Sequence, residues 1–298
     1  MLSIALPKGS SLEQRTLRLF TAAGLEVSRT SERVYRGTIA YDGPLKVAFF
    51  KPREIPKVVE DGTFDVGLTG ADWIEETGAK VEHVVSFTYS KTTDLPWRVV
   101  LAVPVHHAAQ TVQDLAPGTR VATEYPNISH RFLHEAGIHA ELVPSYGATE
   151  GKIPELADAI VDVVETGSAL DHNGLRIIET IRTCTPQFIA SPRAWSDAAR
   201  QRTVQGMARL LSAAHHRAAD VLLTVRVPAR HLDRVARSMP ERAWSVGTGL
   251  RDEGLVVVQG LAVRDGLAET IDGLLAAGAA DVVETEAGVF ASMLPKTP

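Results

Sequence analysis

Short apolar runs rich in valine and isoleucine alternate along the chain with stretches in which apolar residues recur every three or four positions. The short runs are typical of buried strands, and the longer spacing is typical of helices that cover a sheet. The alternation predicts an α/β fold in which crossover helices join parallel strands. Strands are expected at Leu2–Leu6, Lys46–Phe50, Asp65–Leu68, Arg98–Val103, Arg120–Thr123 and Asp158–Val164.

Proline residues divide this α/β region into two predicted lobes. Pro96 opens a segment that we interpret as a second lobe, and Pro186–Ser191 marks the return of the chain to the first. We therefore expect lobe I to comprise residues 1–95 and 180–217, and lobe II to comprise residues 96–179.

The order of predicted elements changes from Asp220 onward. Strands are expected at 221–227, near Trp244, at 255–263 and at 281–285, with helices at 229–239 and 267–277. This βαββαβ order predicts a ferredoxin-like α+β domain over residues 218–298. Because that fold hosts many functions, a small-ligand regulatory role and a dimer-forming role are both open.

Composition narrows the class of protein. The chain has 298 residues and a net charge of -5, which suits a soluble enzyme of two or three compact units and disfavours nucleic acid as a partner. The single cysteine, Cys184, excludes an intrachain disulfide and fits a reducing compartment. The apolar run before Pro7 is too short for a signal peptide or a membrane span. We therefore expect a cytoplasmic protein.

The most informative stretch is Asp158–Leu170, which reads DAIVDVVETGSAL and predicts a strand, a Thr-Gly-Ser turn and a helix. The first N–H groups of a helix lack partners and carry partial positive charge, so such a junction can bind phosphate. Gly167 would let an anion approach the main chain, and Thr166 and Ser168 would add hydroxyl donors.

Three carboxylates accompany this turn. Asp158 and Asp162 are four residues apart and share a strand face, and Glu165 follows them. Ribose hydroxyls and a magnesium ion bound to substrate phosphate are suitable partners for such acids. The pattern indicates a phosphorylated-sugar site, although the spacing also suits a buried strand with solvated acids and a capped helix.

A second strand-to-helix junction is Phe64–Trp73, which reads FDVGLTGADW. Gly67, Thr69 and Gly70 lie near the end of its strand, where open α/β sheets bind ligands. The alternative is a tight turn in which Asp72 caps the helix.

Cations follow two further strands. Lys8 follows the first, and Lys51 and Arg53 follow another, where they could neutralise a pyrophosphate or simply be solvated. The sequence contains no G-x-S-x-G nucleophile motif, so covalent catalysis is not indicated.

Six segments, read in order, resemble the ATP phosphoribosyltransferase family. They are Leu6–Gly9 (LPKG), Lys51–Pro56 (KPREIP), Phe64–Asp72 (FDVGLTGAD), Arg120–Asn127 (RVATEYPN), Gly147–Glu150 (GATE) and Asp158–Leu170. The resemblance implies a catalytic part with two lobes like those of periplasmic solute-binding proteins. Because of the chain's length, it also implies the long form of the enzyme, whose C-terminal ferredoxin-like (ACT-like) domain binds histidine.

The same resemblance implies a reaction and a set of site residues. The reaction joins ATP to phosphoribosyl pyrophosphate at the first step of histidine biosynthesis, with Mg²⁺ as the metal and histidine as the inhibitor. The donor would bind Asp158, Asp162, Glu165, Thr166, Gly167, Ser168, Ala169 and Leu170, and the metal would bind Asp158 and Asp162. The catalytic cations would be Lys8, Lys51 and Arg53, and the nucleotide would contact Gly70, Asp72, Arg98, Thr123 and Tyr125. A homo-oligomer, either a dimer or a hexamer, is also implied.

The sequence departs from the family pattern at Ala169, at Glu155 and across 244–250. Ala169 stands where the family usually has a threonine, and the hydroxyl of Ser168 lies one position away. Two other hypotheses therefore stay open. The protein could be a phosphoribosyltransferase with a different acceptor base, or a non-catalytic sensor of small molecules.

Overall fold

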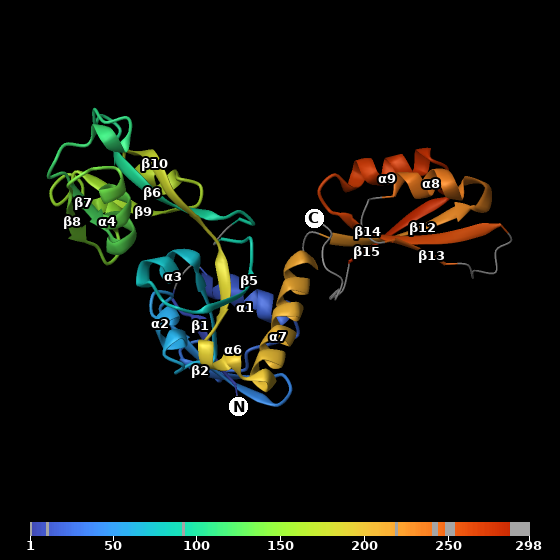
Figure 1. The fold of residues 1–298 in the computed structure, drawn as a ribbon. Coiled ribbons are helices and arrows are strands. Elements are labelled where there is room, and N and C mark those ends of the chain that lie inside the picture. Colours follow the sequence, from blue (N-terminus) through green and yellow to red (C-terminus); the bar gives the residue numbers. More distant parts are fainter. Residues whose placement is uncertain are drawn as a thin grey trace. The chain divides into compact units, whose positions relative to one another are not determined.

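The computed structural model describes residues 2–9, 12–90, 93–217, 220–239, 244–247 and 254–286. The chain divides into two compact units. Unit 1 comprises Met1–Thr21 and Leu25–Ala208, and unit 2 comprises Ala22–Gly24 and Arg209–Pro298. Unit 1 contains two β-sheets and unit 2 contains a third (Figure 1). None of the helices described is both long and apolar enough to traverse a lipid bilayer.

The first sheet of unit 1 has six strands in the order β2-β3-β1-β4-β11-β5, and we call it, with its helices, lobe I. Its strands are β1 (Ser3–Pro7), β2 (Arg36–Ala40), β3 (Pro44–Phe50), β4 (Val66–Gly70), β5 (Glu82–Ser86) and β11 (Pro186–Ala190). Its helices are α1 (Leu12–Ala22), α2 (Ile55–Glu60), α3 (Ala71–Thr77) and α6 (Pro192–Ser196), and α7 (Ala198–Arg217) begins in unit 1.

Only the centre of this sheet is parallel. Strand β1 pairs in parallel with β3 and β4, whereas β2, β11 and β5 pair antiparallel with their neighbours. The prediction of parallel strands is therefore wrong at the edges. Strand β2 folds back on β3 through a tight turn in which Asp42 and Gly43 have positive φ, and β11 enters from the second sheet.

One core cluster of lobe I lies where α2 and α3 pack on the sheet. Its buried cluster consists of Ala5, Ile55, Val59, Ile74 and Ile189. Gly67 on β4 permits this close packing, because a Cβ there would lie 2.6 Å from Ile55 Cγ2 and 2.9 Å from Val59 Cγ2. The glycine that the sequence placed near a ligand site therefore has a packing role.

The second sheet of unit 1 has five strands in the order β10-β6-β9-β7-β8, and we call it, with its helices, lobe II. Its strands are β6 (Trp97–Pro104), β7 (Arg120–Thr123), β8 (Glu141–Pro144), β9 (Ala159–Val164) and β10 (Leu175–Cys184). Its helices are α4 (Pro126–Glu135) and α5 (Ser168–His172), with short 3₁₀ turns η1 (Val112–Asp114) and η2 (Thr149–Lys152). The predicted strands β6, β7 and β9 are confirmed to within one residue at each end.

Strand β10 carries the chain toward lobe I. It pairs antiparallel with β6 from Leu175 to Cys184, and β11 then joins the lobe I sheet (Figure 1). The change of sheet thus falls between β10 and β11, rather than between residues 179 and 180 as expected. No glycine or proline interrupts the sequence between Gly174 and Pro186, so the strand continues across the expected boundary.

Unit 2 is an antiparallel sheet in the order β13-β14-β12-β15. Its elements are β12 (Asp220–Pro228), η3 (Ala229–His231), α8 (Leu232–Ser238), β13 (Trp244–Gly247), β14 (Leu255–Val263), α9 (Leu267–Ala276) and β15 (Asp281–Glu286). Both α-helices lie along one face of the sheet, above buried Val221, Leu223, Val225 and Val258 (Figure 1). The predicted βαββαβ order is confirmed, whereas residues 248–250 of the altered segment lie outside the described residues.

Candidate active site

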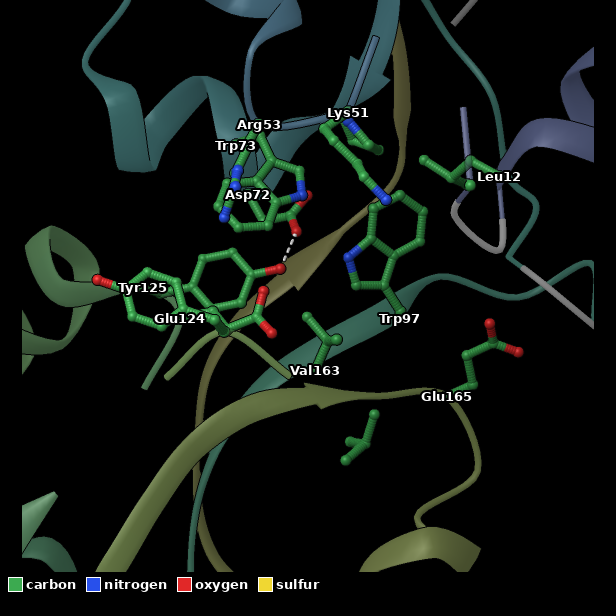
Figure 2. A pocket seen from close by; sticks show the side chains of 14 residues that line it. Leu12, Lys51, Arg53, Asp72, Trp73, Trp97, Glu124, Tyr125, Val163 and Glu165 are labelled. Atoms are coloured by element: carbon green, nitrogen blue, oxygen red, sulfur yellow. Dashed lines mark hydrogen bonds between the residues drawn. The ribbon is translucent and has the colours of Figure 1, made fainter. Parts of the chain in front are cut away.

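Both lobes of unit 1 line a pocket of about 480 Å³ (Figure 2). Lobe I contributes Gly9, Leu12, Lys51, Pro52, Arg53, Asp72 and Trp73, and lobe II contributes Trp97, Glu124, Tyr125, Tyr146, Val163, Val164 and Glu165. Several of these residues directly follow strands: Lys51 follows β3, Glu124 follows β7 and Glu165 follows β9. Carboxyl ends of strands are where open α/β sheets bind ligands, so this pocket is the candidate active site.

Two predicted cations, Lys51 and Arg53, lie on the lobe I side of the pocket (Figure 2). The Lys51 backbone N–H donates to the Glu54 carboxylate over 2.9 Å, and the Thr69 hydroxyl donates to the Pro52 carbonyl over 2.8 Å, which holds this turn in place. Within the described part of the chain, neither cation forms an ion pair. Their charge is therefore available to an anionic ligand.

Lys8 is the third predicted cation, and it is not among the residues that line the pocket. Its ammonium donates to the Glu13 carboxylate over 2.8 Å and to the Glu32 carbonyl over 2.9 Å. Burial alone would raise the pKa of Glu13, but hydrogen bonds from Lys8 and the Gly9 amide, with the charge of Arg29, hold that pKa below its ordinary value. Lys8 thus supports the turn at Gly9.

Gly9 brings that turn close to Lys51. Its φ is +62°, and a Cβ at Gly9 would lie only 3.1 Å from Lys51 Nζ. The motif predicted around Lys8 therefore contributes its glycine to the pocket, while its lysine points to Glu13.

A buried carboxylate, Asp72, joins the two lobes at the pocket. It is 2% exposed at the start of α3, and the Tyr125 hydroxyl from lobe II donates to its Oδ2 over 2.8 Å (Figure 2). Its Oδ1 has no hydrogen-bond partner among the described residues. Burial raises the pKa of Asp72 to about 6, although the hydrogen bond from Tyr125 opposes the rise. Asp72 can therefore change protonation state near neutral pH.

Gly70, which the sequence placed at the nucleotide, makes room for this carboxylate. A Cβ at Gly70 would lie 2.0 Å from Asp72 Oδ1 and 2.8 Å from Trp97 Cζ2. Any side chain at this position would displace Asp72 or the indole ring. Gly70 thus acts through its neighbours and does not itself line the pocket.

Aromatic rings form much of the remaining wall. Trp73 stacks on Tyr125, with ring centroids 4.4 Å apart and an interplanar angle of 29°. Trp97 and Tyr146 complete the aromatic lining. Sequence reasoning missed Trp73, Trp97 and Tyr146 as site residues. Trp73 ends the FDVGLTGADW junction and Trp97 directly follows the proline that opens lobe II, and these two positions could have drawn attention to them.

The Thr-Gly-Ser turn follows β9 as predicted. Gly167 has a φ of +88° and is the N-cap of α5, a helix of five residues. The hydroxyls of Thr166 and Ser168 are exposed and lie 3.3 Å from each other. Leu170 is buried in the core of lobe II and anchors the turn, while Ala169 is exposed. The turn is continuous with Val164 and Glu165 of the pocket.

The predicted acid pair, Asp158 and Asp162, does not form one site. Asp158 precedes β9, and its two carboxylate oxygens accept hydrogen bonds from the Arg120 guanidinium at 2.7 and 3.2 Å. Asp162 lies near the other end of that strand, about 13 Å further along at roughly 3.3 Å per residue. Asp158 and Asp162 therefore do not lie side by side as expected, because a shared strand face does not imply proximity.

Asp162 lies among other acids of lobe II. Burial raises the pKa of Asp162 to about 6, and the charges of Glu150 and Glu124 raise it further, against hydrogen bonds from the Val163 amide and the Thr149 hydroxyl. Glu124 and Glu165 line the pocket themselves, so lobe II contributes acidic side chains to it.

Two further predicted residues, Arg98 and Thr123, are not among the residues that line the pocket. Thr123 is buried, and its hydroxyl accepts a hydrogen bond from the Tyr125 N–H over 2.8 Å, which supports the turn that presents Tyr125. Arg98 on β6 donates to the Thr180 hydroxyl over 3.4 Å. The structure therefore brings Lys51, Arg53, Asp72, Tyr125 and Glu165 together at the pocket.

A two-lobed α/β unit whose pocket combines exposed cations with aromatic rings belongs to a class of proteins suited to small molecules that contain both phosphate and a ring. Comparison with known proteins narrows this class. The model of the family described as "HisG: ATP phosphoribosyltransferase" matches residues 51–213. The chain therefore belongs to the ATP phosphoribosyltransferase family, the enzymes of histidine biosynthesis that transfer a phosphoribosyl group to ATP.

Similar proteins of this family match nearly the whole chain. An ATP phosphoribosyltransferase of Prosthecochloris aestuarii is 40% identical over 284 residues, 95% of each chain. One of Pelotomaculum thermopropionicum is 37% identical over 283 residues, 95% of this chain and 96% of the other. A solved ATP phosphoribosyl transferase (HisG:HisZ) complex from Thermotoga maritima shares the fold, with a TM-score of 0.61 and 24% identity over 72% of this chain and 99% of that chain. The predicted family, reaction and α/β fold class are confirmed.

Proposed function

We propose that ATP and phosphoribosyl pyrophosphate react in the pocket between lobes I and II. The observation that carries this proposal is that cations and aromatic rings line the same pocket. Lobe I supplies Lys51 and Arg53 without ion pairs among the described residues, and the facing wall holds Trp97 and Tyr125. Cations suit a departing pyrophosphate, and aromatic faces suit a purine.

On the donor side, the pyrophosphate contacts Lys51 and Arg53, and the 5-phosphate lies on the turn at Thr166–Leu170. The backbone conformation at Gly167 and the exposed hydroxyls of Thr166 and Ser168 support this assignment. Asp162, near the end of the same strand, then faces the sugar. Asp158 is left out because Arg120 occupies its carboxylate.

On the acceptor side, adenine lies against the aromatic wall. The stacked pair of Trp73 and Tyr125 and the indole of Trp97 give it flat, apolar surfaces, and Asp72 holds the Tyr125 hydroxyl. A pocket of about 480 Å³ is large enough for the reacting base and sugar together.

The reaction needs no general base to activate its nucleophile. The lone pair of adenine N1 forms the new bond to C1 of the ribose, while the C1–O bond breaks and its electron pair leaves with the pyrophosphate. A proton of the exocyclic amino group is then released. Because N1 needs no deprotonation before attack, the side chains act by holding both substrates in line and by neutralising the leaving group.

ATP phosphoribosyltransferases use a metal ion, and we propose that here it is Mg²⁺. No group of three or more His, Cys, Asp or Glu side chains in the described ranges is arranged to hold a metal. Mg²⁺ usually takes only one or two protein carboxylates, with water and substrate phosphate oxygens as its other ligands. Asp162 and Glu165 would hold it, and its charge would stabilise the departing pyrophosphate.

In this proposal, unit 2 is the regulatory domain. Its ferredoxin-like order suits a small-ligand regulatory domain, and we assign histidine as the inhibitor that binds there. We also infer a homo-oligomer, either a dimer or a hexamer, and a cytoplasmic location, which fits the free, buried Cys184.

The test is turnover by the full chain. ATP, phosphoribosyl pyrophosphate and Mg²⁺ should give N1-(5-phosphoribosyl)-ATP and pyrophosphate, and omission of any one of them should abolish the product. Pyrophosphate release with another base in place of ATP would contradict the assignment of ATP as the acceptor. Binding of both substrates without product would favour a non-catalytic sensor.

A further inference from the structure

Helix α4 of lobe II is capped by a residue of lobe I. Its N-cap, Tyr125, makes no side-chain cap hydrogen bond. Instead, the backbone N–H groups of Asn127 and Ile128 donate to the two carboxylate oxygens of Glu76, each over 2.9 Å. The Asn127 side-chain amide also donates to the Glu76 carbonyl over 2.9 Å. One residue of α3 therefore satisfies the first turn of a helix in the other lobe.

This contact has the features of a specific anchor. The first N–H groups of a helix lack partners within the helix and attract negative charge, so a carboxylate is their best ligand. Glu76 is 6% exposed, and a carboxylate buried to this degree needs such donors. Burial raises its pKa, while the two amide donors and the charge of Arg131 oppose the rise.

The anchor lies next to the aromatic wall of the pocket on both of its elements. On α4, Tyr125 immediately precedes the capped turn. On α3, Asp72 and Trp73 lie one helical turn before Glu76 and contact Tyr125. The position of Tyr125 relative to Asp72 and Trp73 thus depends on how α4 is held against α3.

We propose that Glu76 is a positioning residue for the nucleotide: by capping α4 across the lobe boundary, it sets the aromatic wall against which adenine binds. It acts through Tyr125 and does not itself touch the substrate, since it is not among the pocket's lining residues. The inference rests on the proposed acceptor side of the pocket.

The neighbouring residue, Glu75, supplies a matched control. It lies on the same helix and also reaches lobe II, where Arg131 and Arg182 bind its carboxylate at 2.7 and 2.5 Å. Both arginines are about half exposed, at 48% and 52%, and ion pairs of this kind contribute little. Replacement of Glu75 should therefore leave the position of α4 unchanged.

The experiment compares Glu76→Gln with Glu75→Gln in the full chain. In glutamine an NH2 group, which cannot accept a hydrogen bond, replaces one of the two carboxylate oxygens, so one of the two N–H groups loses its acceptor and α4 loses half of its cap. We expect the Kd for ATP and the KM for ATP to rise about tenfold in Glu76→Gln, with the KM for phosphoribosyl pyrophosphate within about twofold of wild type. Glu75→Gln should stay within about twofold for both substrates.

Two further variants keep the outcomes separable. Asn127→Ala removes only the side-chain donor to Glu76, and we expect the same selective loss of ATP affinity at about threefold, even if Glu76→Gln fails to fold. Tyr125→Ala tests the acceptor side itself, and unchanged ATP affinity there would contradict the proposed function. A different pattern would overturn only the positioning role of Glu76. In that pattern Tyr125→Ala reduces ATP affinity, whereas Glu76→Gln and Asn127→Ala affect both substrates equally or neither.

Discussion

At the scale of single residues, Asp72 lowers the stability of the folded protein and also lines the candidate active site. Its pKa rises from 3.8 to about 6 because the carboxylate is buried, so the folded protein binds this proton more tightly than the unfolded chain does. The free energy of unfolding is therefore lowered above pH 6, and the loss is relieved as the pH falls through 6 toward 3.8. The size is roughly 3 kcal/mol by this linkage.

Asp72→Asn should make that cost visible. The neutral amide avoids burying a charge, so we expect a higher free energy of unfolding at pH 8, by roughly 1–3 kcal/mol, and about half that gain at pH 5. Activity should fall at the same time, because the variant changes the partner of Tyr125. Urea unfolding at both pH values measures the effect. Asp61→Asn, at an exposed carboxylate that accepts the Thr63 N–H, should give no gain, and an equal gain there would refute the explanation.

Lys51 is the residue on which the donor assignment depends most. Lys51→Met keeps the alkyl chain and removes the charge, so a lost contact to pyrophosphate should cost about 1.5–3 kcal/mol, or roughly one to two decades in kcat/KM for phosphoribosyl pyrophosphate. Lys57→Met is the control, because Lys57 is exposed on α2 and pairs with Glu60 over 2.7 Å. Steady-state kinetics that show the same values for Lys51→Met and wild type would remove Lys51 from the donor site.

At the scale of elements, the sequence identifies central strands well and edge strands poorly. Strand β9 (AIVDVV) is apolar except for Asp162 and is predicted to within one residue, whereas β2 (RGTIA) and β5 (EHVVS) have only two adjacent apolar residues and expose polar ones. The same limit affects the site. The turn at Thr166–Leu170 could be predicted because all its parts are adjacent in sequence. The Arg120 partner of Asp158 depends on pairing between strands, which spacing along one strand cannot indicate.

Whether the turn after β9 binds the donor can be tested by substituting two glycines that have similar left-handed backbone conformations. Gly167 and Gly174 flank α5 with φ values of +88° and +65°, and alanine should destabilise either site by about 1–2 kcal/mol. Only Gly167 belongs to the proposed phosphate turn. Gly167→Ala should therefore raise the KM for phosphoribosyl pyrophosphate, while Gly174→Ala should lower stability alone. Unfolding curves and kinetics on both variants decide the matter, and matching KM values would mean that the turn does not bind the donor.

At the scale of the whole molecule, the candidate active site and the ferredoxin-like domain belong to separately packed units. The candidate active site lies entirely within unit 1, and the core of unit 2 is built from its own strands and helices, around residues such as Val225 and Leu274. The sequence predicts a separate domain from residue 218, because the change from βα to βαββαβ is visible along the chain, whereas the compact unit begins at Arg209 and includes Ala22–Gly24. The pocket required the fold, because its two walls come from segments far apart in sequence.

If histidine acts through unit 2, the two functions should be separable. A chain ending at Arg217 keeps the whole of α7 and both lobes, and we expect it to form product without inhibition by histidine. In the full chain, Val225→Asp places a charge in the core of unit 2, where Val225 is fully buried, and should abolish the same inhibition. Initial rates with and without histidine measure both variants, and circular dichroism shows whether each remains folded. Inhibition that persists in either active variant would place the histidine site in unit 1.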